Sequence, residues 1–227
     1  MHAEQLAEML STHSLFADCG PDELAEIILR GNYMKYDKGH EIMGQGEEGD
    51  KLFIMLTGYA RTSMIASNGR EIVLDYAEAG HVVGEIAFLD GGERTASVHA
   101  LDNVTALVLT RSAFDEIVSK HQGLAMRLLQ SMARRLRQSN SIIEADRAFT
   151  SGPRLARYLL RLMLSDPEEE RLKLDLSQSE LGNFVGLSRE QINRQLSSWV
   201  ESGLIKLDTG RIHILNRDLL LEIAETI

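Results

Sequence analysis

The amino-acid sequence predicts an α+β fold with three parts: an N-terminal antiparallel β-roll, a long helix, and a small helical domain at the C-terminus. Eleven of the 18 glycines lie between Gly31 and Gly92, where they separate short alternating runs such as KLFIMLTG and REIVLDYA. Short strands with glycine turns are typical of a β-roll or barrel. Helical periodicity starts near Arg111 and dominates the rest of the chain.

Local signals place the elements within this fold. One short helix, PDELAEIILR, flanks the β-roll, and Asn68-Gly69 predicts a two-residue hairpin turn between two strands. The long helix is expected to break near Gly123. A hinge follows at 150–153, where Gly-Pro ends one helix and Pro153 starts the next. We expect the domains to span residues 1–110, 111–148 and 149–227.

The composition excludes several classes of protein. Cys19 is the single cysteine in 227 residues, which excludes a disulfide framework, a zinc finger and a cysteine-ligated iron–sulfur cluster. The seven histidines form no HxH or HxxxH pair, and no nucleophile elbow or Walker loop is present, so we expect no metal site, no catalytic residues and no enzyme. No apolar run approaches the ~20 residues of a membrane span, and the acidic N-terminus is unlike a signal peptide. These features predict a soluble, cytoplasmic protein without a membrane partner.

The formal net charge of −10 is unevenly distributed. Residues 1–146 carry 13 basic and 22 acidic side chains, a net charge of −9, whereas residues 147–227 carry 11 and 12, a net charge of −1. Because the C-terminal domain is almost neutral, the overall acidity does not exclude a nucleic acid partner.

The long helix carries two apolar stripes. Steps of three and four define a heptad seam, which we expect to join two copies of the chain as a parallel homodimer. A second stripe, Leu129, Leu136 and Ile143, is expected to pack on the β domain. The polar seam residues fix the register or face a ligand held between subunits, and the sequence leaves this open. The seam consists of Ala125, Leu128, Met132, Arg135, Ser139 and Ile142.

The segment 84–96, GEIAFLDGGERTA, has the chemistry of an anion site. Gly84 permits close backbone approach, and the turn that follows it exposes free N–H groups. Glu85 can accept from a sugar hydroxyl, while Arg94 and Thr95 can donate to a phosphate. This combination fits a nucleotide, but it also fits a surface loop with an ordinary Glu–Arg pair.

This segment, together with QGE at 45–47, resembles the phosphate-binding cassette of cyclic nucleotide-binding β-rolls. It is most similar to the cAMP receptor protein branch of the CRP/FNR regulators. The resemblance implies that Glu85 holds the ribose 2′-hydroxyl and that Arg94 and Thr95 hold the cyclic phosphate. It assigns the following cassette residues to the ligand site: Gly84, Glu85, Ile86, Ala87, Arg94, Thr95 and Ala96.

The run MARRLRQSNS, residues 132–141, resembles the helix that meets the base in this family. Arg135 matches an arginine near the base, and Ser139 keeps the first of two hydroxyl residues that usually contact the adenine amino group. Asn140 departs from the family pattern, because its amide both donates and accepts and therefore suits adenine or guanine. The resemblance implies that cAMP is the allosteric ligand, with cGMP as the alternative, and that no cofactor is required.

Residues 177–203 predict two short capped helices joined by a turn that contains Gly186. Ser177 with Glu180, and Ser188 with Gln191, have the spacing of capping boxes, and the pair of helices is typical of a helix-turn-helix. We expect the core side of the second helix to carry Ile192, Leu196, Trp199 and Val200. The opposite face begins with four polar residues that suit base edges, although Glu190 and Arg194 also have the spacing of a surface ion pair. We expect double-stranded DNA to be contacted by Ser177, Ser188, Arg189, Glu190, Asn193 and Arg194.

The segment VGLSREQINRQL resembles the recognition helix of the same family, which reads palindromic TGTGA-type half-sites. The following LIKLDTGRIHIL resembles its β-wing, so the fold implied is a winged helix-turn-helix. The acidic stretch DPEEE, at 166–170, is expected to form a solvated turn. It lies in SDPEEERLK, which poorly matches the loop that touches RNA polymerase in the family, so RNA polymerase stays an open partner.

Three alternatives remain. A cyclic nucleotide hydrolase would need a metal or a nucleophile that the motifs do not supply. A redox or haem-bound sensor of the same fold would need ligands beyond Cys19, such as His81. A ligand-independent regulator would retain Glu85 and Arg94 as relics, and an Arg94→Leu variant distinguishes it.

Overall fold

The computed structural model describes residues 3–163, 172, 176–208 and 211–226. The chain divides into two compact units, Met1–Arg137 and Gln138–Ile227. Within the described ranges, no helix has both the length and the apolar character needed to cross a membrane.

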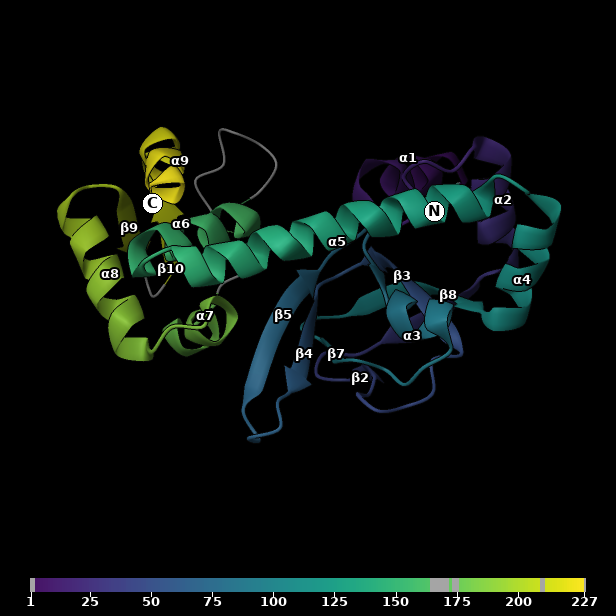
Figure 1. Ribbon diagram of the computed structural model, residues 1–227, viewed down its shortest axis with the longest axis horizontal. Coiled ribbons are helices and arrows are strands. Elements are labelled where there is room, and N and C mark those ends of the chain that lie inside the picture. Colours follow the sequence, from purple (N-terminus) through teal and green to yellow (C-terminus); the bar gives the residue numbers. More distant parts are fainter. Residues whose placement is uncertain (1–2, 164–171, 173–175, 209–210, 227) are drawn as a thin grey trace. The chain divides into compact units, whose positions relative to one another are not determined.

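The first unit contains two four-stranded antiparallel sheets, ordered β1-β8-β3-β6 and β2-β7-β4-β5 (Figure 1). The inner strands β3 and β8 are buried along most of their length, whereas the edge strands β1 and β5 expose many of their side chains. This confirms the predicted β-roll. The strands are β1 (Asn32–Tyr36), β2 (Glu41–Met43), β3 (Lys51–Thr57), β4 (Ala60–Ile65), β5 (Glu71–Ala77), β6 (Val82–Val83), β7 (Ser97–Ala100) and β8 (Val104–Thr110).

The hairpin predicted at Asn68-Gly69 joins β4 to β5, but its turn is longer than two residues. The Ala66 N–H donates to the Arg70 carbonyl at 2.9 Å, and the Gly69 N–H donates to the Ala66 carbonyl at 2.8 Å. Gly69 has a φ of +80°, which explains the glycine at this position. The position predicted for the hairpin is therefore confirmed, but the predicted length of its turn is wrong.

Among the described residues, four helices lie before the long one. They are α1 (Ala3–His13), α2 (Pro21–Arg30), α3 (Glu85–Asp90) and α4 (Arg111–Lys120). The sequence prediction found α2 but did not include α1, whose Leu10 is fully buried. The core of this unit joins Leu10 to Phe16, Ile27, Phe88 and Ile117, so the N-terminal helices cover one side of the roll.

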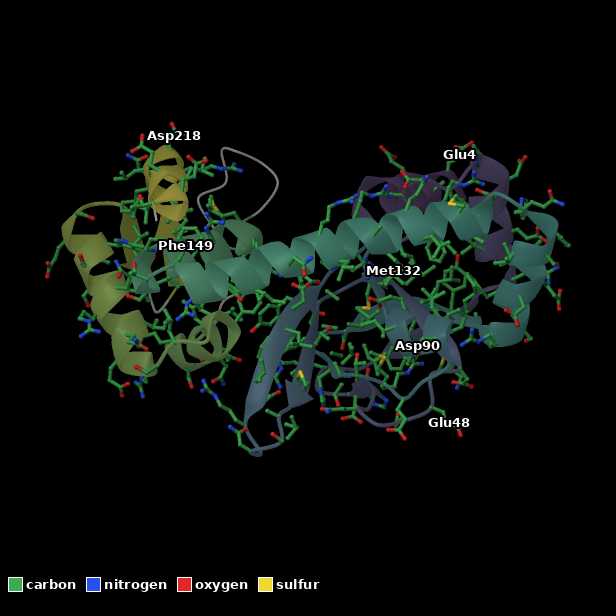
Figure 2. The ribbon with its side chains drawn as sticks, viewed as in Figure 1. Glu4, Glu48, Asp90, Met132, Phe149 and Asp218 are labelled. Carbon is green, nitrogen blue, oxygen red and sulfur yellow. The ribbon has the colours of Figure 1, made fainter. Side chains whose placement is uncertain are left out.

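Helix α5 (Leu124–Ala148) follows α4 after a break at residues 121–123, as the glycine at 123 predicted. One face of α5 packs on the core of the first unit. Leu124 is fully buried, Leu128 is 5% exposed, and Met132 packs against the same core (Figure 2).

The burial of the two apolar stripes on α5 within one chain is the opposite of what the sequence suggested. Leu129 and Leu136 are each 63% exposed and Ile143 is 50% exposed, although this stripe was expected to pack on the β domain. Leu128 and Met132, expected in an intersubunit seam, are instead part of the roll's own packing. Both stripes have heptad spacing, so spacing alone could not decide which one faces the core. The side chain of Ile142 lies outside the described residues.

The second unit contains the C-terminal helices and a two-stranded sheet: α6 (Ser151–Leu162), α7 (Gln178–Val185), α8 (Arg189–Glu201), β9 (Ile205–Asp208), β10 (Arg211–Ile214) and α9 (Arg217–Glu225). Its core includes Leu155, Leu159, Phe184 and Trp199, and the Tyr158 ring meets Phe184 edge to face at 4.8 Å.

Two sequence expectations for this unit are corrected. The predicted hinge residues 151–153 belong to the first turn of α6, with Thr150 as the N-cap, because a proline in the first turn needs no intrahelical donor. Val200, expected on the core side of α8, is 40% exposed, whereas Ile192, Leu196 and Trp199 are buried as predicted.

The β-wing is confirmed by the antiparallel pairing of β9 with β10. The tip of the wing, residues 209–210, and the acidic stretch 166–170 lie outside the described residues.

Candidate functional site

The predicted anion segment starts at Gly84, the N-cap of α3, where φ is +80°. A Cβ at this position would lie 2.6 Å from Arg94 Nη1, so glycine is required both by the backbone and by the approach of the guanidinium. Ile86 is exposed, and Ala87 is buried against the loop at Gly49. The first turn of α3 is thereby fixed beside Arg94.

Arg94 is the most buried cation of the candidate site, with 4% of its surface exposed. Its Nη1 donates to the Gly84 carbonyl and its Nη2 to the Lys51 carbonyl, each at 2.6 Å. The guanidinium also lies over the Phe53 ring, 5.8 Å from the centroid. Burial lowers the pKa of Arg94, and nearby carboxylates oppose this shift. A buried, fixed guanidinium is well suited to bind a phosphate.

The loop at 44–50 anchors the backbone of Arg94. The Arg94 N–H donates to the Glu47 carbonyl at 2.8 Å, and the Gly46 N–H donates to the Arg94 carbonyl at 2.9 Å. The Glu47 carboxylate accepts from the Gly44 N–H at 2.9 Å. The QGE motif, residues 45–47, therefore has a structural role, because it holds Arg94 in place. Next to Arg94, Thr95 is exposed and Ala96 is buried.

The structure brings a third predicted residue to the same place. Arg135, on α5, places its Nη1 2.8 Å from Glu85 Oε1, across 50 residues of sequence. Glu85, Arg94 and Arg135 are therefore neighbours within the first unit. Ser139 and Asn140 lie further along α5, in the residues of the second unit, and both are exposed.

Ion pairs that the sequence did not reveal hold α4 and α5 against the N-terminal helices. Arg127 pairs with the buried Glu23, and Arg134 pairs with Asp18. Glu26 accepts from Lys120 at 2.6 Å and contacts His121 at 3.0 Å. Hydrogen bonds from Lys120 and then His121 lower the pKa of Glu26 to about 2. The partners are some 90 to 120 residues apart, so no local pattern predicts them.

Cys19 lies close to this region and is partly buried. Burial and the neighbouring Glu23 raise the pKa of its thiol to about 12. The side chain is therefore a neutral thiol at physiological pH, and neutral thiols react slowly with oxidants.

In the second unit, both predicted capping boxes form. The Glu180 N–H donates to Ser177 Oγ at 3.2 Å, and the Ser177 N–H donates to Glu180 Oε2 at 2.9 Å. Ser188 and Gln191 make the same two contacts at the start of α8, also at 3.2 and 2.9 Å. Gly186, with a φ of +73°, ends α7 and turns the chain toward α8. The sequence therefore fixes both helix starts and the turn between them.

The polar face of α8 is presented as predicted. Arg189, Glu190 and Arg194 are exposed, and Asn193 is half-buried. Hydrogen bonds from its own backbone N–H and from Ser188 lower the pKa of Glu190, which is therefore ionised at neutral pH. Among the residues that the structure describes, no ion pair joins Glu190 to Arg194. An arginine and a glutamate at the start of such a helix can read guanine and cytosine edges, respectively.

Comparison with known protein families gives two matches. A cyclic nucleotide-binding domain matches residues 33–121, and a Crp-like helix-turn-helix domain matches residues 153–223. The first match contains Gly84, Glu85 and Arg94, and the second contains α7 and α8.

Relatives of similar length are also found. The chain is 30% identical over 218 residues to the CRP-like cAMP-activated global transcriptional regulator of Mycobacterium tuberculosis, covering 94% of this chain and 97% of that protein. It is 28% identical over 210 residues to the cyclic AMP receptor protein of Thermus thermophilus, covering 92% and 96%. Among solved structures, FixK2 from Bradyrhizobium japonicum superposes with a TM-score of 0.74 at 22% identity, covering 87% of this chain and 98% of that one, which supports the fold alone.

Proposed function

The chain belongs to the CRP/FNR family of transcription regulators, and on this premise we propose that cAMP is its effector and that a homodimer binds palindromic TGTGA-like DNA. The coarser statement follows from the family itself: the protein is a cyclic nucleotide-binding, DNA-binding regulator rather than an enzyme. As a regulator of DNA, it would act in the cytoplasm of a bacterial cell.

The observation that carries the proposal is the buried guanidinium of Arg94 beside Gly84 and Glu85. Arginine has five N–H donors, and the two carbonyl contacts leave donors for a phosphate. We assign the cyclic phosphate to Arg94 and Thr95, and the ribose 2′-hydroxyl to the Glu85 carboxylate. The backbone N–H groups of Ile86 and Ala87, at the start of α3, are within the same cassette.

Arg135 connects the proposed ribose position to α5. In the structure its guanidinium pairs with Glu85 at 2.8 Å, so a ribose that bonds to Glu85 changes this ion pair. We assign the base to the neighbourhood of Arg135, Ser139 and Asn140. The Asn140 amide suits adenine or guanine, so cGMP is the alternative effector.

We further propose that the exposed stripe of α5, Leu129, Leu136 and Ile143, forms the parallel homodimer seam. This assignment replaces the seam expected from the sequence. If the ligand binds one arrangement of the paired helices more tightly, it shifts the population toward that arrangement. The two α8 helices would then lie ~34 Å apart, one DNA turn, in successive major grooves.

Calorimetric titration of the full-length protein with cAMP and with cGMP, with and without operator DNA, tests the effector. We expect cAMP to bind more tightly than cGMP, and operator DNA to increase the affinity for the effector. An Arg94→Leu variant whose DNA binding and response to nucleotide are both unchanged from wild type would support a ligand-independent regulator instead.

Selection of binding sites from random DNA tests the target. We expect paired GTGA-like half-sites separated by one helical turn. Recovery of unrelated or unpaired sequences would contradict the assignment of Arg189, Glu190 and Arg194.

A further inference from the structure

The β4–β5 hairpin extends further than β7, its neighbour in the same sheet. In this sheet β4 lies between β7 and β5 (Figure 1). Its pairing with β7 ends at Ser63↔Ser97, whereas its pairing with β5 continues to Ile65↔Glu71. Ile65 therefore lies two residues beyond the end of the ladder on the β7 side. If β7 continued in the same register, Thr95 would be the residue opposite Ile65.

The side-chain amide of Gln45 takes the place of that strand residue. Its Oε1 accepts from the Ile65 N–H at 2.7 Å, and its Nε2 donates to the Ile65 carbonyl at 3.4 Å. A primary amide offers an acceptor and a donor side by side, as a strand residue does. The backbone polar groups of Ile65 are thereby paired without a continuation of β7. Thr95 itself lies outside β7 and is exposed.

Backbone contacts hold Gln45 between the hairpin and the cassette. Its own N–H donates at 2.9 Å to Ser97 Oγ, at the start of β7. Gly46, the next residue, has a φ of +85° and donates its N–H to the Arg94 carbonyl at 2.9 Å. Gln45 therefore contacts the hairpin through its side chain, while the residue beside it is bonded to Arg94.

We propose that Gln45 is a positioning residue of the nucleotide site, whose amide pairs with Ile65 in place of Thr95 and so keeps Thr95 free for the phosphate. The inference rests on the proposed function, because it concerns the same phosphate position. Without the amide, the Ile65 N–H and carbonyl would be open to the segment that precedes β7. Extension of the antiparallel ladder by that segment would draw Thr95 away from the ligand.

A double-mutant cycle, measured by calorimetry on the full-length protein, tests this role. Gln45→Ala removes the amide, and Thr95→Val removes the hydroxyl but keeps the branched shape. We expect Gln45→Ala to weaken cAMP binding about tenfold in the wild-type chain. In the Thr95→Val background the same change should cost less than about twofold, because the hydroxyl that Gln45 positions is already absent. If cGMP is the effector, the same cycle applies to cGMP.

Two further variants separate the amide from the size of the side chain. Gln45→Asn keeps an amide that is one methylene too short to reach Ile65, so it should behave like Gln45→Ala. Gln45→Glu keeps the acceptor for the Ile65 N–H but turns a carboxylate oxygen toward the Ile65 carbonyl, so its affinity should lie between those of Gln45→Ala and the wild type. These variants also serve if Gln45→Ala does not fold.

The thermal stability and a matched control show whether the effect is specific. Ile65 is 55% exposed, so water can replace the amide and the Tm of Gln45→Ala should change little. Gln122→Ala alters an exposed glutamine in the break between α4 and α5 and should keep the wild-type affinity. An equal loss of affinity in Gln122→Ala would overturn the inference, because the effect would then not belong to Gln45.

The remaining outcomes distinguish this inference from the proposed function. If cAMP binds and Gln45→Ala costs the same in both backgrounds, Gln45 acts independently of Thr95 and the positioning role alone is overturned. Unchanged affinity in Gln45→Ala overturns it as well. If the wild-type chain binds neither cAMP nor cGMP, the proposed function is wrong and this inference with it.

Discussion

The two units present their functional charges in opposite ways. In the first unit, Arg94 is buried with carbonyl partners, and Glu85 is paired with Arg135. In the second unit, Arg189 and Arg194 are exposed on α8. Buried charges that lose a partner are costly, whereas exposed charges contribute little to stability. Substitutions in the first site should therefore affect both folding and binding, while those on α8 should affect binding alone.

The net charge also differs between the N-terminal and C-terminal parts of the chain. Residues 1–146 carry −9 and residues 147–227 carry −1, so the DNA-reading half has no excess of basic residues. Affinity that depends on phosphate contacts rises with the number of basic contacts. We therefore expect weak binding to random DNA, with affinity that depends on the sequence and on the effector.

The largest effect is expected for Leu136, an apolar residue of α5 that belongs neither to the proposed nucleotide site nor to the proposed DNA contacts. Leu136 is 63% exposed in one chain, so Leu136→Glu should leave the roll folded. In the proposed dimer it would place a charge in the seam of both copies and cost about 4 kcal/mol, or about a thousandfold in the dimer dissociation constant. Sedimentation equilibrium measures this change.

Leu29→Glu is the matched control, because Leu29 is more exposed than Leu136 and lies on α2. It should remain dimeric. A Leu136→Glu protein that also stays dimeric at low concentration would contradict the α5 seam.

Arg94→Leu should have the next largest effect and tests the buried side of the comparison. It removes the phosphate donor and leaves the Gly84 and Lys51 carbonyls without their side-chain donor. We expect nucleotide affinity to fall at least about a hundredfold, roughly 3 kcal/mol, together with a lower Tm. Calorimetry and thermal unfolding measure the two effects. The control is Arg70→Leu, an exposed arginine on the β4–β5 hairpin, which should change neither.

Arg189→Ala tests the exposed side. We expect affinity for the specific operator to fall by about 1–3 kcal/mol with little change in Tm, since the proposed base contacts are lost while the Arg189 side chain is exposed in the folded protein. Fluorescence anisotropy with operator and with random DNA makes the measurement. Ser198→Ala, at an exposed position of the same helix, is the control. Equal weakening on both DNAs would mean that Arg189 contacts phosphate rather than a base.

The smallest effect concerns the ion pairs of the first unit. The pKa of Glu26 is lowered to about 2, so its contribution to stability is complete above its ordinary pKa of 4.5 and is lost as the pH falls toward 2. We expect Glu26→Gln to lower the Tm slightly at pH about 7 and the difference to vanish near pH 2. Thermal unfolding across this range measures it, with Glu201→Gln in the second unit as the control. A constant difference would show that Glu26 acts through packing rather than charge.

Local signals were sufficient for much of the fold. Glycine spacing predicted the roll, two capping boxes predicted α7 and α8, and Gly123 predicted the break before α5. These features are decided within a few residues of the chain, where φ, capping and hydrogen bonding act directly. The family resemblance, now confirmed, named Glu85, Arg94 and Arg135 as site residues, and these three are neighbours in the structure.

The features that the sequence did not reveal depend on distant contacts. Whether Leu128 or Leu129 faces the core depends on where Phe16 and Phe88 lie, and both stripes have the same spacing. The Lys51 carbonyl that receives Arg94 is 43 residues away. Helix α1 and the ion pairs of Glu23 and Glu26 likewise depend on packing between segments that are far apart in sequence.

The thiol of Cys19 has a practical consequence for work on this protein. Because burial and the neighbouring Glu23 raise its pKa to about 12, it forms far less thiolate at neutral pH than an ordinary exposed cysteine. The wild-type chain therefore serves as a background for site-specific dye labelling. In a Ser197→Cys variant, the exposed thiol on α8 should take up a maleimide fluorophore well before Cys19, so that the arrival of this helix at DNA can be followed in real time.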